Sequence, residues 1–169
     1  MNKSNKWIAA TLVPLSLLVS IKQFESSGKE HPIPYKDVAG VLTVCDGHTG
    51  SDIIQGKVYT PEECKNLLEK DIAKHGKGVL NCVEVPITLK EYEAYTSFAF
   101  NIGVGNFCAS NVLRTLNAGN RELACKGIYQ HPNGKPAWSY SGGKYVQGLQ
   151  NRRIEEYKIC MEGVRMGVF

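Results

Sequence analysis

The sequence has no cluster of basic residues, no internal repeat and no low-complexity segment. Basic and acidic residues alternate along most of the chain, and the formal net charge is only +4, which argues against a nucleic-acid-binding protein. With 169 residues, of which 43% are hydrophobic and 21% charged, the composition is typical of one compact domain. We expect a monomer.

Spacings typical of metal sites are also missing. The six cysteines include no C-x-x-C pair, and the four histidines lie far apart at His31, His48, His75 and His131. We therefore predict no metal site. An even number of widely spaced cysteines instead indicates disulfide bonds formed in an oxidising compartment.

Long hydrophobic runs are scarce, and the one near the N-terminus is short. Residues 7–21 are uncharged and are flanked by Lys6 and Lys22. As a helix this run would span about 22 Å, less than a hydrocarbon core of about 30 Å, and Pro14 would kink it. These features favour a weakly held membrane segment.

A cleavable signal peptide is the alternative interpretation of this run, but no A-x-A-like cleavage site follows it. Cutting near Ser20 would also remove the turn that precedes Glu25. We therefore predict an uncleaved export anchor at residues 1–23, followed by a folded domain at residues 24–169.

Capping signals and apolar periodicity predict most of the secondary structure. The segments starting at Thr60 and Thr88 carry a cap residue and a capping-box glutamate, and the second leads into the predicted central buried helix. Further helices are expected at 110–116, 120–130 and 146–163, a hairpin at 38–45, and a loop at 131–144. The fold class is α+β, with a small hairpin lobe, a helical lobe and a cleft between them.

The predicted central helix is flanked by Cys82 and Cys108, which we expect to form a disulfide. The remaining cysteines then suggest the pairs Cys45–Cys64 and Cys125–Cys160, although the sequence does not choose among the possible pairings.

Two carboxyl groups near the N-terminus could perform glycoside hydrolysis. Inversion needs a carboxylic acid that protonates the leaving oxygen and a carboxylate that activates water on the opposite side. Glu25, beside apolar Phe24, is the candidate acid, and Asp37, in a polar turn, is the candidate base. Thr43 could hold the water by its hydroxyl. By spacing alone, however, such residues are more often ordinary surface groups.

Three ordered blocks of sequence resemble the phage-type lysozymes, or endolysins, of glycoside hydrolase family 24. The first block is the active-site signature, Tyr35-Lys36-Asp37 with Gly40, Thr43 and Gly47-His48-Thr49. The second is a central-helix block, residues 97–107 with 113–119. The third is a C-terminal block that consists of Trp138, Gly142-Gly143, Gly148-Leu149 and Arg152-Arg153. The resemblance covers roughly residues 22 to 165.

This resemblance implies a lysozyme-like fold and cleavage of the β-1,4 bond between N-acetylmuramic acid and N-acetylglucosamine in peptidoglycan, without a cofactor. Glu25, Asp37 and Thr43 would be the catalytic residues. The interval between Glu25 and Asp37 is three residues longer than in the family pattern, which indicates an insertion between Ser26 and His31. Glu30 is the rival general acid, but Glu25 continues an apolar helix and follows Phe24.

Among endolysins, the chain resembles those of the signal-anchor-release type. Residues 7–21 would hold the exported protein at the host inner membrane, with Glu25 pinned at the headgroups and the enzyme inactive. Release into the periplasm, on membrane depolarisation or with a holin-type trigger, would activate it and lyse the host cell.

Two other functions remain open at this point. A lytic transglycosylase would cut the same bond with one glutamate, and Asp37 and Thr43 argue against it. A non-enzymatic, membrane-tethered wall-binding module would require that the longer Glu25 to Asp37 interval has destroyed the site. We expect His48 to order the hairpin by a hydrogen bond or salt bridge, and Asn101 and Arg153 to be structural.

Overall fold

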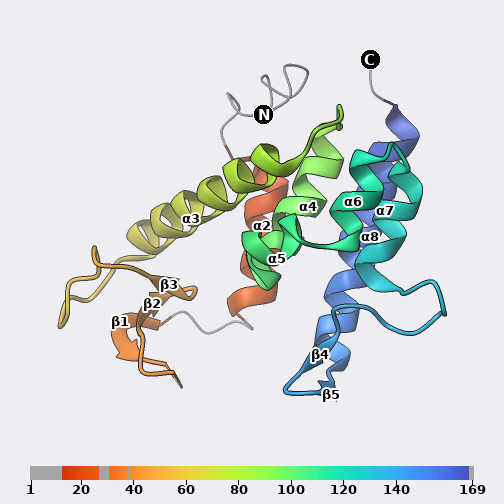
Figure 1. Ribbon diagram of the computed structural model, residues 1–169. Helices are drawn as coiled ribbons and strands as arrows, with labels where there is room; N and C mark the ends of the chain where they lie inside the picture. Colours follow the sequence, from red (N-terminus) through yellow and green to blue (C-terminus); the bar gives the residue numbers. More distant parts are fainter. Residues whose placement is uncertain (1–12, 27–30, 38, 168–169) are drawn as a thin grey trace. The chain divides into compact units, whose positions relative to one another are not determined.

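The computed structural model describes residues 13–26, 31–37 and 39–167 (Figure 1). These residues fall into two compact units, residues 13–73 and residues 74–167. The boundary lies within helix α3 (Pro61–Cys82), which contributes to both units.

The first unit begins with helix α2 (Leu15–Ser26), which ends where the sequence predicts a helix stop. One face of α2 is buried through Leu17, Leu18 and Ile21, whereas Leu15 and Val19 on the other face are exposed. The helix thus includes part of the apolar run and crosses the boundary predicted between residues 23 and 24. Within the described ranges, no helix is long and apolar enough to cross a membrane.

A small antiparallel sheet follows α2, with the strand order β1 (His31–Lys36), β2 (Leu42–Cys45) and β3 (His48–Thr49). The hairpin predicted within residues 38–45 is wrong in extent, because its first strand is β1 and lies before residue 38. Pro32 and Pro34 are compatible with β1 because it is an edge strand, where a missing N–H breaks no ladder. The predicted Asp46-Gly47 turn joins β2 to β3.

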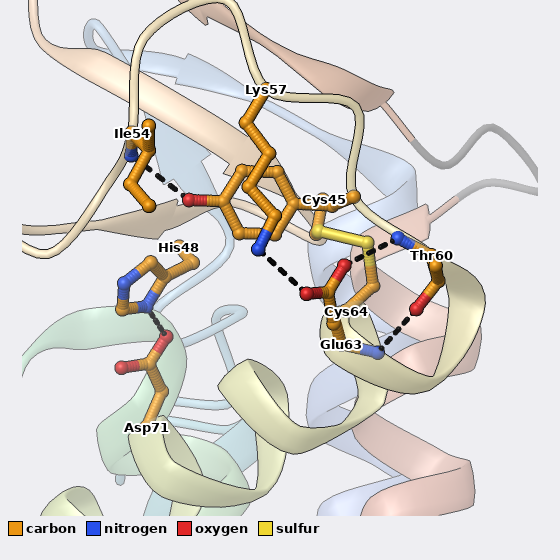
Figure 2. Close-up of a disulfide and its surroundings, with 9 residues drawn as sticks. Cys45, His48, Ile54, Lys57, Thr60, Glu63, Cys64 and Asp71 are labelled. Carbon is orange, nitrogen blue, oxygen red and sulfur yellow. Dashed lines mark hydrogen bonds and ion pairs between the residues drawn. A yellow bond between two sulfur atoms is a disulfide. The ribbon is translucent and has the colours of Figure 1, made fainter.

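The sheet is attached to the start of α3 by an apolar cluster and a disulfide. Cys45, at the end of β2, is bonded to Cys64 in the first turn of α3, and both lie among buried residues Val44, Ile53 and Tyr59. The predicted capping box is present: the Thr60 N–H donates to the Glu63 carboxylate and the Glu63 N–H to the Thr60 hydroxyl (Figure 2).

The second unit contains five further helices besides the end of α3. Their bounds, and those of a short hairpin, are α4 (Leu89–Ile102), α5 (Val104–Cys108), α6 (Asn111–Asn117), α7 (Arg121–Tyr129), β4 (Tyr140–Ser141), β5 (Lys144–Tyr145) and α8 (Gln147–Met166). Helix α4 is the predicted central helix, and α8 packs against it and against α7. The segment 131–144, predicted as a loop, carries β4 and the start of β5.

A buried ionic cluster joins α4 to α8. Glu156 is fully buried, and its carboxylate pairs with Arg152 at 3.1 Å and Arg153 at 2.8 Å while Ser97 donates to it at 2.8 Å. Burial raises the pKa of Glu156, and the two arginines act in the opposite direction. Arg153 also lies over the Phe98 ring, 5.0 Å from its centroid. The structure therefore gives Arg153 the packing role that the sequence predicts.

All three suggested disulfides are confirmed. The second unit holds two of them: Cys82 at the end of α3 is bonded to Cys108 at the end of α5, and Cys125 on α7 is bonded to Cys160 on α8. These two bonds each join one helix to another, and Cys125–Cys160 reinforces the packing of α7 against α8.

Helix α8 approaches the start of α4 so closely at Gly163 that there is no room for a side chain. A Cβ there would lie 2.4 Å from the Thr88 hydroxyl oxygen and 2.8 Å from the Glu91 backbone nitrogen. We expect Gly163→Ala to lower the free energy of unfolding by about 1–3 kcal/mol, because the helices must separate. Gly148, on the same helix, has open space around it. Gly148→Ala is the control and should be neutral or stabilising by up to about 1 kcal/mol in denaturant melts. Equal effects of the two substitutions would contradict close packing at Gly163.

Candidate active site

Asp37 opens the connection between β1 and β2 and is fixed there by its own loop. Its Oδ1 accepts hydrogen bonds from the backbone N–H groups of Ala39 at 2.8 Å and Val41 at 2.9 Å. Gly40, with φ of 78°, donates its N–H to the Asp37 carbonyl at 2.9 Å. A positive φ favours glycine, so the Gly40 of the signature serves this turn. Among the described residues no hydrogen bond to Oδ2 is found.

Thr43 is joined to Asp37 through one carbonyl oxygen. The Val41 carbonyl accepts the Asp37 backbone N–H at 2.9 Å and the Thr43 hydroxyl at 3.0 Å. The Asp37 nitrogen and the Thr43 hydroxyl oxygen therefore cannot lie further apart than the sum of these two distances. Thr43 is only 4% exposed and lies on the middle strand, opposite Tyr35 and Thr49. The structure thus brings two of the three predicted catalytic residues together.

Glu25 lies in the last turn of α2 and is half-buried. Its helix belongs to the same unit as Asp37 and Thr43. The rival acid, Glu30, lies outside the described residues, as does the segment 27–30 in which the insertion is predicted. The choice between Glu25 and Glu30 therefore stays a prediction.

His48 is held between two carboxylates next to the sheet. Its Nδ1 lies 2.8 Å from Asp71 on α3, and its Nε2 lies 3.1 Å from Asp52 (Figure 2 shows the first pair). Because carboxylates only accept, both bonds form together when both ring nitrogens carry a proton. His48 is 5% exposed and pairs with Val44 of β2 in the ladder. His48 thus makes the kind of hydrogen bonds through which we expect it to order the hairpin.

The residues around His48 were not predicted from sequence. Lys70 lies 2.6 Å from the other oxygen of Asp52, and the ammonium of Lys70, followed by His48, lowers the pKa of the Asp52 carboxyl. A lowered pKa means that these contacts stabilise the fold above the ordinary carboxyl pKa and are lost in strong acid. The four-residue spacing of His48 and Asp52 is only a weak sequence signal that the two side chains interact. No sequence signal indicates the contact of His48 with Asp71, because that contact depends on the tertiary fold.

Within the described parts of the chain, no group of three or more histidine, cysteine, aspartate or glutamate residues could hold a metal ion. The polar groups predicted for the candidate site are the carboxyls of Glu25 and Asp37 and the hydroxyl of Thr43. These groups can donate a proton, accept one and orient a water molecule, which is the chemistry of glycoside hydrolysis.

Comparison with known proteins agrees with this chemistry. The family model described as phage lysozyme matches residues 22–156. A SAR-endolysin of Bacteriophage PS119 is 44% identical over 130 residues, which cover 77% of this chain and 74% of that protein. Among solved structures, a mutant P22 lysozyme gives a TM-score of 0.74 at 28% identity, covering 89% of this chain and 99% of the other. The muramidase domain of SpmX from Asticaccaulis excentricus also gives 0.74, at 27% identity, covering 88% and 97%.

The chain belongs to the phage lysozyme family. It is a glycoside hydrolase of the lysozyme type and functions as an endolysin. The α+β, lysozyme-like fold class and the enzyme class predicted from the sequence are both confirmed.

Removing the His48 ring tests whether its contacts order the sheet that carries Thr43. We expect His48→Leu to lower the free energy of unfolding by about 1–3 kcal/mol, because Asp71 loses a hydrogen-bond partner. Lytic activity should fall as well, since β3 flanks the strand of Thr43. Lys70→Met is the matched control: Lys70 is 66% exposed and pairs with the outer carboxylate, Asp52, so the Lys70→Met variant should lose clearly less stability than His48→Leu. A His48→Leu protein with unchanged stability would contradict this role.

Proposed function

We propose that this lysozyme cleaves the β-1,4 bond between N-acetylmuramic acid and N-acetylglucosamine in peptidoglycan with inversion at the anomeric carbon. Glu25 is the general acid that protonates the leaving oxygen, and Asp37 is the general base. The observation that carries the proposal is the shared Val41 carbonyl, because it ties the candidate base to the hydroxyl that holds the water.

Hydrogen-bond directions explain how Thr43 would assist the reaction. Its hydroxyl proton is already donated to the Val41 carbonyl, so the oxygen acts toward water as an acceptor. A water molecule that gives one hydrogen to Thr43 and the other to Oδ2 of Asp37 keeps a lone pair directed at the anomeric carbon. As the new bond forms, Asp37 takes the proton while Glu25 releases one to the departing sugar oxygen.

We further propose that residues 1–23 act as an export anchor and residues 24–169 as the catalytic domain. Residues 7–21 hold the exported chain at the host inner membrane until release into the periplasm, with depolarisation or a holin-type partner as the trigger. Two observations support this: relatives carry the name SAR-endolysin, and Leu17, Leu18 and Ile21 of the same run are buried in the folded protein. The same side chains cannot face lipid and the protein interior at once, so the tethered chain lacks the complete fold. The released enzyme works as a monomer.

Substitution of the carboxyls tests the catalytic roles. We expect Glu25→Gln and Asp37→Asn each to reduce the rate of clearing of purified cell walls by at least about 100-fold. This is the lower end of the rate loss expected when a general acid or a general base is removed. Thr43→Val should also reduce clearing, while Glu30→Gln retains it. Mass spectrometry of the parent's products should find reducing N-acetylmuramic acid ends formed by water.

Circular dichroism of each variant serves as the folding control. If Glu25→Gln still cleared walls and Glu30→Gln did not, the acid would be misassigned. If the products carried 1,6-anhydro ends, the enzyme would be a lytic transglycosylase. If the folded parent bound walls without clearing them, the protein would be a wall-binding module.

Tethering can be tested in cells that express only this protein. Collapsing the membrane potential should cause lysis within minutes in the parent and none in the Glu25→Gln variant, because release without catalysis leaves the wall intact. Fractionation before and after collapse should move the protein from the membrane to the soluble periplasmic fraction. Intact parent cells, with the protein still in the membrane, would contradict release by depolarisation.

A further inference from the structure

The hairpin of β4 and β5 displays two tyrosines that have no role in the proposed reaction. Tyr140 and Tyr145 face each other across the two strands, with ring centroids 5.8 Å apart. They are 50% and 45% exposed, so about half of each side chain remains available for contact. All residues from 140 to 148 are exposed, and Figure 1 shows the hairpin beside the start of α8.

The base of this hairpin is fixed to the second unit. Trp138, two residues before Tyr140, packs edge-on against buried Phe98 at 5.4 Å. Ser139 is fully buried, its carbonyl accepts the Val146 N–H at 2.8 Å, and its hydroxyl donates to the Gln150 side chain at 2.5 Å. A rigid base presents the exposed rings in one arrangement, which lowers the entropy lost when a ligand binds.

The hairpin carries a positive charge at Lys144. Residues 123 to 154 contain no aspartate or glutamate. The lysines of this segment, Lys126, Lys135 and Lys144, are all exposed, whereas its two arginines are buried against Glu156. Lys144 therefore places a positive charge on the hairpin itself, which favours an anionic partner, whereas Lys126 lines a surface pocket together with Glu122.

Amide groups continue this surface into the first turns of α8. The Tyr145 hydroxyl donates to the Gln147 side-chain oxygen at 3.1 Å, and the Gln147 amide donates to Asn151 at 2.8 Å. Gln147 and Asn151 are exposed, and each side-chain amide has both donor and acceptor capacity. Such groups suit the N-acetyl groups and hydroxyls of amino sugars.

We propose that Tyr140, Lys144, Tyr145 and Gln147, here called the tyrosine hairpin, bind the glycan strand of peptidoglycan and its peptide stems. Aromatic faces carry partial negative charge and contact the C–H face of a pyranose ring. Lys144 pairs with stem carboxylates, and Gln147 binds N-acetyl groups. The proposal rests on the wall-degrading function above but uses none of its catalytic residues.

A lipid surface is the other anionic partner that tyrosine and lysine could serve. Insertion into lipid requires exposed aliphatic groups, and the hairpin offers only Val146, which is 37% exposed. The amides of Gln147 and Asn151 would lose water on insertion without gaining partners. The surface therefore fits a sugar–peptide polymer better than a membrane.

Binding to purified walls tests the proposal in the full-length chain carrying Asp37→Asn, which leaves the wall intact. Replacing both tyrosines by valine keeps strand-forming residues but removes the rings, and we expect wall binding about tenfold weaker. Replacing both by phenylalanine should preserve binding within about twofold, since the rings remain. Leu123→Ala, which removes another exposed apolar side chain of the second unit, is the matched control and should bind like the parent.

Circular dichroism and melting curves show whether the valine variant remains folded. Unchanged wall binding by a folded valine variant would overturn the proposal, as would an equal loss in the Leu123→Ala control. Loss of binding to vesicles of anionic lipid, with wall binding retained, would assign the surface to the membrane instead. Wall turbidity recorded in the same samples shows whether the Asp37→Asn chain still cleaves, so a failure of the catalytic proposal is distinguished from a failure of binding.

Discussion

The attachment of the small sheet to α3 is the constraint on which the candidate site depends. The three strands contain few residues and β1 is largely exposed, so the sheet has too little apolar surface to be stable by itself. The Cys45–Cys64 disulfide holds one end of β2 to α3, and His48 connects β3 to Asp71 further along the same helix. Thr43 lies on β2 itself and pairs with Thr49 of β3, so both attachments act on the strands that hold it.

Local chemistry explains why much of this arrangement was predictable. The cap residues Thr60 and Thr88 define helix starts through contacts within three residues, and the structure has both capping boxes. The roles of Asp37 and Gly40 also depend on one short loop. The first strand was missed because Pro32 and Pro34 disfavour a central strand, and only the edge position makes them acceptable.

Contacts between segments that are distant in the chain could not be predicted from the sequence. Asp71 approaches His48 across 23 residues, and Glu156 meets Ser97 across 59, and no periodicity encodes either pair. The fully buried Glu156 would be an unfavourable isolated charge, but Arg152 and Arg153 on the same helix neutralise it. Arg153 and Arg152 precede Glu156 by three and four residues, a spacing that predicts ion pairs along one face of a helix. The burial of these pairs depends on the assembled unit and cannot be predicted from that spacing.

The three disulfides close loops that follow one another along the chain without overlapping: 45–64, 82–108 and 125–160. Every bond therefore joins two cysteines that are consecutive in the sequence. A polypeptide that enters an oxidising compartment from its N-terminus can form each native bond from the two thiols that arrived most recently. No earlier bond has to be broken to complete the set, so correct oxidation requires only an oxidant and not a reshuffling catalyst.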